Sequence, residues 1–143
     1  SVFICNVDVV SDLDPNVLLR EHERNGALAT LALRDRPTDR LLVVDGEMHV
    51  RGWKNAKSGE TKGEVREEYR SLAFSGQHVV STELFPLMRH SGAFSIIDTY
   101  LDLAPTGRIM GLMDESRVWM DVGKPAELEF AATLLDQVMP WKP

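Results

Sequence analysis

An apolar run at the start of the chain constrains the fold more than any other feature. Residues 2–7 read Val-Phe-Ile-Cys-Asn-Val, and Asp8 follows directly. Such a run is typical of a strand that is buried on both faces, so we expect Cys5 to be buried. The sequence then provides a helix start, because Asp12 or Asp14 can cap a helix that has Pro15 in its first turn. A strand followed by a helix is half of a βαβ unit, which predicts an α/β fold.

Further strands and helices are predicted along the rest of the chain. In order, the pattern predicts a helix ending at Asn25-Gly26, a strand at 27–33, a hairpin of 41–44 with 48–53 turned at Asp45-Gly46, a loop at 54–68, strand residues at 69–80 interrupted at Ser75-Gly76, a short helix after Ser81, a helix from Ser95 to about 105, strands at 108–113 and 117–120, and a helix from 123 to about 138. The last helix carries apolar residues at helical spacing, so we expect it to pack on the sheet through Leu128, Ala131, Ala132, Leu135 and Val138.

Composition restricts the class of protein. A chain of 143 residues with 43% hydrophobic residues can bury one core, which predicts a single domain over residues 1–143. The net charge of −6 leaves no basic face for nucleic acid. The single cysteine excludes a disulfide framework, and no apolar run approaches the roughly 20 residues of a membrane span. We therefore expect a cytoplasmic protein that binds neither nucleic acid nor a membrane.

Two aspartates follow apolar strand segments and form the first candidate site. Asp8 follows the run at 2–7, and Asp121 follows the strand predicted at 117–120. Open α/β sheets collect ligands where the carboxyl ends of strands converge, so the two carboxylates are expected to meet there. Their hard oxygens suit Mg²⁺, which commonly takes one or two carboxylates together with substrate phosphates. The alternative is that each aspartate only caps its own local turn.

Several blocks of the sequence resemble one enzyme family in order and spacing. These blocks are residues 6–14, the helix with His22, and residues 29–32, 73–80, 94–101 and 119–125. They resemble the sugar-1-phosphate nucleotidyltransferases, also called NDP-sugar pyrophosphorylases. The resemblance implies a three-layer αβα arrangement around a Rossmann-like mixed sheet. It covers nearly all of this chain but only the C-terminal portion of the family's catalytic domain, because the G-x-G-T-R-x-x-P-x-T loop that binds the nucleotide has no match here.

The resemblance also implies roles for individual residues. Asp8 and Asp121 match the pair that coordinates Mg²⁺, and Gly76 matches a glycine whose backbone approaches the sugar, although a plain strand bulge explains this glycine equally well. Asn55 and Ser95 fall on the sugar side. Lys54 is the candidate for the family's catalytic lysine, against the alternative of a solvated hairpin lysine. Two departures, Val7 for a glycine and Ala93 for a sugar-binding glutamate, leave the sugar contacts open.

The implied activity is transfer of a nucleotidyl group from an NTP to a sugar-1-phosphate, which gives an NDP-sugar and pyrophosphate with Mg²⁺ as cofactor. This chain would supply the metal ligands and the sugar side and would be inactive alone, because it lacks the triphosphate loop. The alternative is a non-catalytic truncated or degenerate relative that binds a sugar phosphate or a partner chain. Uncovered strand edges also lead us to expect a dimer or larger homo-oligomer.

Overall fold

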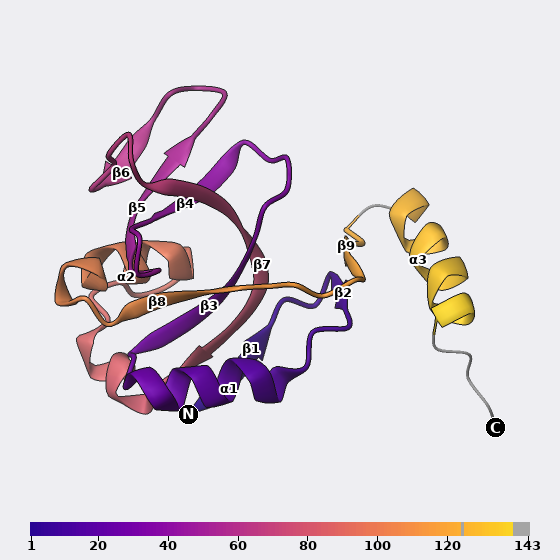
Figure 1. Cartoon of the computed structure of the whole chain (residues 1–143), viewed down its shortest axis with the longest axis horizontal. Helices are drawn as coiled ribbons and strands as arrows, with labels where there is room; N and C mark the ends of the chain where they lie inside the picture. Colours follow the sequence, from indigo (N-terminus) through magenta and orange to yellow (C-terminus); the bar gives the residue numbers. More distant parts are fainter. Residues whose placement is uncertain (124, 139–143) are drawn as a thin grey trace.

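The computed structural model describes residues 1–123 and 125–138 of the chain (Figure 1). Along the chain the elements are β1 (Val2–Cys5), β2 (Val9–Ser11), α1 (Pro15–Asn25), β3 (Ala29–Arg34), β4 (Arg40–Val44), β5 (Val50–Asn55), β6 (Thr61–Gly63), β7 (Arg70–Val80), the 3₁₀ helix η1 (Thr82–Leu87), α2 (Ile96–Leu103), the 3₁₀ turn η2 (Ala104–Thr106), β8 (Ile109–Met113), β9 (Trp119–Asp121) and α3 (Pro125–Val138). The predicted helix starts are confirmed, since Asp14, Ser81 and Ser95 each cap a helix through a side-chain oxygen.

A mixed seven-stranded sheet forms the centre of the molecule. Its order is β6-β5-β4-β7-β3-β8, and β1 pairs separately with β7. The β3–β8 pair is parallel, whereas the other pairs within this sheet are antiparallel. Strands β2 and β9 form a second, two-stranded antiparallel sheet beside it, which we call the ribbon (Figure 1). The fold is therefore mixed α/β.

The longest strand, β7, carries an irregularity at the predicted position. In its pairing with β3, Leu31 lies opposite His78 and Leu33 lies opposite Phe74, so β7 holds two extra residues between these pairs. Gly76 lies inside this bulge with φ +80°. The strand thus continues through the interruption predicted at Ser75-Gly76, and the glycine permits a backbone conformation that other residues rarely adopt.

Helices α1 and α2 cover opposite faces of the sheet. On β3, Ala32 packs with Leu18 of α1, whereas Leu31 belongs to the larger cluster that contains Tyr100 of α2. Thr30 points to the same side as Ala32 and hydrogen-bonds through Oγ1 to Nδ1 of His22 on α1, at 3.0 Å. Because successive strand residues point to opposite faces, a strand buried on both sides must be apolar nearly throughout, as β3 is.

Strand β1 differs from the prediction of a strand buried on both faces. Phe3 is 39% exposed and Val2 is 42% exposed, and Cys5, predicted to be buried, is also exposed. The physical reason is that, within the described residues, β1 pairs along one edge with β7 and with no strand on its other edge. An apolar run therefore predicted the strand correctly but not its surroundings.

Two further predictions need correction. The segment 54–68, predicted as a loop, contains β6, which extends the hairpin by pairing with β5. Helix α3 was expected to pack on the sheet, but it packs mainly with β9 and extends away from the sheet (Figure 1). Of its apolar residues, Ala131 is buried while Leu128 is 57% exposed and Ala132 is exposed. The side chains of Leu135 and Val138, named in the same prediction, lie outside the described residues.

No helix in the described ranges combines the length and apolarity that a membrane crossing requires.

A buried histidine joins β7 to α2. His78 Nδ1 hydrogen-bonds to the hydroxyl of Tyr100, and both side chains are almost fully buried. Burial disfavours the imidazolium and lowers the pKa of His78 to about 4. Burial also raises the pKa of Tyr100, so both partners are neutral at pH 7.

This buried pair predicts that the protein loses stability in mild acid. Because the pKa of His78 is about 4 in the folded chain and 6.5 as a reference value, the unfolded state binds more protons between these pH values. The free energy of unfolding should therefore fall as pH drops from 6.5 to 4, by about 3 kcal/mol from this residue. Urea unfolding at several pH values measures the loss. His78→Gln should lack this share of the pH dependence, and an unchanged slope in that variant would contradict the assignment.

Candidate functional site

The ribbon brings Asp8 and Asp121 together. Val9 on β2 lies opposite Asp121 on β9, and the backbone N–H of Val122 donates to the carbonyl oxygen of Asp8 at 2.7 Å. The backbone N–H of Gly123 donates to Oδ1 of Asp121 at 3.0 Å, which fixes that carboxylate over the turn. Two residues that are far apart in the sequence are thus neighbours through backbone pairing.

Gly123 marks the space that the two carboxylates share. A Cβ atom placed on Gly123 would lie 3.2 Å from Oδ1 of Asp121 and 3.6 Å from Oδ2 of Asp8, so these oxygens are at most about 7 Å apart. Asp8 is half-buried and Asp121 is exposed. Because glycine has no side chain, no Cβ atom crowds the two carboxylates at this position.

The donor set fits a magnesium ion that shares its coordination with a substrate. Carboxylate oxygens are the ligands that Mg²⁺ prefers, and Mg²⁺ is often held by only one or two of them, with phosphates and water completing the shell. Within residues 1–123 and 125–138, no group of three or more His, Cys, Asp or Glu side chains is arranged to hold a metal ion. The aspartate pair could therefore hold the ion only in company with other ligands.

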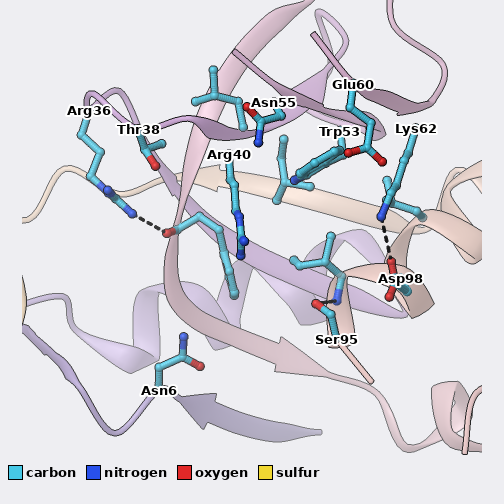
Figure 2. A pocket seen from close by; sticks show the side chains of 15 residues that line it. Asn6, Arg36, Thr38, Arg40, Trp53, Asn55, Glu60, Lys62, Ser95 and Asp98 are labelled. Carbon is cyan, nitrogen blue, oxygen red and sulfur yellow. Dashed lines mark hydrogen bonds and ion pairs between the residues drawn. The ribbon is translucent and has the colours of Figure 1, made fainter. Parts of the chain in front are cut away.

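A cavity of about 590 Å³ lies beside β4, β5 and β7 (Figure 2). Its two ends differ, since Figure 2 shows Arg36 and Asn6 on one side and Lys62 with Asp98 on the other. The wall combines apolar surface with basic, acidic and amide groups, as sites for small molecules commonly do. The lining residues are Asn6, Arg36, Thr38, Arg40, Leu41, Leu42, Trp53, Asn55, Glu60, Lys62, Phe74, Ser95, Ile97, Asp98 and Leu101.

Of the residues proposed from the sequence for the substrate side, Asn55 and Ser95 line this cavity. Lys54 does not. It stands between Trp53 and Asn55 on β5, and because side chains alternate along a strand, it points to the opposite face of the sheet. The cavity wall therefore receives its cations from other segments.

Gly76 lies under the turn that carries Asp8. Its carbonyl oxygen accepts a hydrogen bond from the backbone N–H of Asn6 at 2.9 Å. A Cβ atom on Gly76 would lie 2.9 Å from Cγ2 of Val9 and 3.0 Å from Nδ2 of Asn6. The alternative of a strand bulge is confirmed, and glycine is required by the positive φ and by the contacts with Val9 and Asn6. Gly76 is not among the residues that line the cavity, and its approach to a sugar stays a prediction.

Three cations of the cavity were missed by the sequence analysis. Arg36 lies in the short connection between β3 and β4, Arg40 is the first residue of β4, and Lys62 lies on β6, inside the segment predicted as a loop. Lys62 Nζ lies 3.6 Å from Oδ1 of Asp98 and 5.0 Å from the centre of the Trp53 ring. The only signal in the sequence was that Arg36 and Arg40 lie close together along the chain. This spacing does not by itself show that both side chains line one cavity.

Comparison with known proteins supports the fold alone. The sequence matches no family model and no curated protein. Among solved structures, the chain is similar to a protein from Bacillus anthracis assigned as a glucose-1-phosphate thymidylyltransferase, which was crystallised with sucrose. The TM-score is 0.65 with 15% sequence identity, over 92% of this chain and 53% of the other.

The fold is similar to that of a nucleotidyltransferase structure. The match extends over about half the length of that protein. At this identity the likeness concerns architecture and does not carry over the activity or the ligand of the other protein.

The position of Gly76 leads to a test of how the aspartate turn is supported. Gly76→Ala adds a methyl group that meets Val9 and Asn6 at a φ of +80°. We expect a loss of about 2–3 kcal/mol, from backbone strain together with overpacking. Gly107→Ala is the matched control, because Gly107 has a φ of +70° with nothing within 4 Å of the added atom, and it should lose only about 1 kcal/mol. Equal losses in chemical denaturation would show that the contact with the turn is unimportant.

Proposed function

We propose that this chain provides the metal-binding and sugar-binding half of a sugar-1-phosphate nucleotidyltransferase. The observation that carries the proposal is the paired carboxylates of Asp8 and Asp121 beside a cavity lined by polar and aromatic groups. In the proposed reaction a phosphate oxygen of the sugar-1-phosphate attacks the α-phosphorus of an NTP. The new P–O bond gives the NDP-sugar, and the bond to the β-phosphate breaks with release of pyrophosphate. No protein nucleophile is needed.

Positioning and charge neutralisation are what the protein must contribute to this chemistry. A Mg²⁺ ion bound at Asp8 and Asp121 would neutralise the phosphates that react. The side chains of the cavity would hold the sugar, with Asn6 and Asn55 offering amide groups to hydroxyls and the Trp53 ring offering an apolar face. A volume of about 590 Å³ is within the usual range for sites that take small molecules.

A second candidate is a non-catalytic protein that binds a sugar phosphate. The observation in its favour is that the residues lining the cavity include neither Asp8 nor Asp121. The two candidates differ in what the aspartates do. A nucleotidyltransferase half needs both carboxylates for binding that depends on Mg²⁺, whereas a simple sugar-phosphate binder does not.

The first test is binding of α-D-glucose 1-phosphate with and without Mg²⁺, measured by isothermal titration calorimetry. We expect Mg²⁺ to strengthen binding of the sugar phosphate. Asp8→Asn and Asp121→Asn should each weaken binding in Mg²⁺ by about ten-fold or more, because each variant loses a charged metal ligand. Asp136→Asn is the control, since Asp136 is an exposed residue on α3. If binding were independent of Mg²⁺ and of both aspartates, the non-catalytic candidate would be preferred. If no binding occurred in any condition, both candidates would fail.

The second test concerns catalysis by these 143 residues alone. Because the residues that would cradle the triphosphate are missing from the sequence, we expect no release of pyrophosphate above background from any NTP and hexose 1-phosphate pair. A coupled phosphate assay over several NTPs measures this. Turnover by the isolated chain would show that another segment binds the nucleotide and would overturn the proposed division of roles.

A further inference from the structure

We infer that Arg36 binds the phosphate group of the sugar phosphate, at the end of the cavity that faces the aspartate pair. The inference rests on the proposed function and adds a residue that the sequence resemblance did not provide. Lys54, the candidate for the catalytic lysine, does not line the cavity, because it lies on the opposite face of β5.

The side chain of Arg36 is held between the two parts of the site. Its Nη2 donates to the carbonyl oxygen of Phe74 on β7 at 3.4 Å (Figure 2). Its guanidinium lies 4.2 Å from the centre of the Trp119 ring. Trp119 is on β9, two residues before Asp121, and is itself fixed by a hydrogen bond from Nε1 to the carbonyl oxygen of Ser75 at 2.8 Å. Arg36 therefore lines the cavity while its guanidinium lies over a side chain of the strand that carries a proposed metal ligand.

The hydrogen-bonding capacity of Arg36 is only partly used. A guanidinium has five N–H donors, and the structure assigns one bond, to Phe74. Its Nε is buried and has no hydrogen-bond partner among the described residues. Nε itself is out of reach of a ligand, so the donors open to one are those of Nη1 and the second N–H of Nη2, which have no hydrogen-bond partner in the described residues. Phosphate suits the vacant donors, because two of its oxygens match the planar fork of arginine.

Charge at this end of the cavity also favours a phosphate. Burial lowers the pKa of Arg36, and the carboxylate of Asp121 acts in the opposite direction, but an arginine remains a cation at neutral pH. The other cations of the cavity are less suitable. Lys62 is already paired with Asp98 at the other end, and Arg40 is exposed. A phosphate bound at Arg36 would thus lie between a fixed cation and the two carboxylates that would hold the metal ion.

The experiment compares α-D-glucose 1-phosphate with glucose as ligands of the whole chain in Mg²⁺. The ratio of their dissociation constants, followed by NMR titration, reports the contribution of the phosphate alone. We expect Arg36→Gln to reduce the preference for the phosphorylated sugar by about ten-fold or more, the usual worth of a hydrogen bond to a charged group, with glucose affinity unchanged. Arg36→Lys keeps the charge without the planar fork and should give an intermediate preference. Arg20→Gln, which removes the same charge from an exposed position on α1, should match the wild type.

Each other outcome separates the inference from the proposed function. If Arg36→Gln keeps the wild-type preference, Arg36 does not bind the phosphate, while the proposed function stands. If the variant weakens both ligands equally, Arg36 acts only by packing on Trp119, which also overturns the inference. If the wild type has no preference for the phosphorylated sugar, the proposed function fails and the inference fails with it. Should Arg36→Gln not fold, the preference of Arg36→Lys decides, because a wild-type value there would exclude the bidentate contact.

Discussion

Three consecutive carbonyl groups of β7, at the start of its bulge, hold the candidate site together. The carbonyl oxygens of residues 74–76 accept hydrogen bonds from the side chain of Arg36, from Nε1 of Trp119 and from the backbone N–H of Asn6. On the edge of β7 opposite β3, the pairing with β4 ends at Leu72 and the pairing with β1 begins at Gln77, so residues 73–76 have no strand partner there within the described residues. Each donor belongs to a different segment, so one irregularity in one strand attaches the cavity and both arms of the ribbon to the same piece of backbone.

This attachment explains how two distant parts of the sequence can form one site. Asn6 precedes Asp8 by two residues, and Trp119 precedes Asp121 by two residues. Trp119 and Asp121 lie on the same face of β9, because side chains alternate along a strand. Asn6 begins the turn that carries Asp8, since its carbonyl oxygen accepts a hydrogen bond from the backbone N–H of Val9 at 3.2 Å. The surrounding structure supports the bulge from the other side. Ser75 Oγ donates to Oδ2 of Asp114 at 2.9 Å, and that carboxylate pairs with Arg34 at 3.2 Å.

The sequence predicted local features well and long-range ones less well. The caps at Asp14 and Ser95, the hairpin at Asp45-Gly46 and the interruption at Ser75-Gly76 depend on neighbouring residues and were predicted correctly. The exposure of β1 and the position of α3 depend on which segments pack nearby, which no local pattern records. Asp8 and Asp121 were expected to meet at the carboxyl ends of strands in one sheet, but an antiparallel ribbon of its own brings them together. Arg36 lay outside any motif, since its role depends on a cavity formed by several separate segments.

The ribbon has only three residue pairs, and this shortness has a consequence for binding. Short pairs of strands with little buried apolar surface open locally at a small cost in free energy, well below that of global unfolding. Opening the ribbon would separate Asp8 from Asp121, so only the closed population is competent to hold a ligand between them. A ligand that bridges both carboxylates then favours closure by its own binding energy, and its apparent affinity includes the cost of closing. The ribbon amides would exchange with solvent more slowly once the ligand is bound, which links occupancy of the site to the order of β2 and β9.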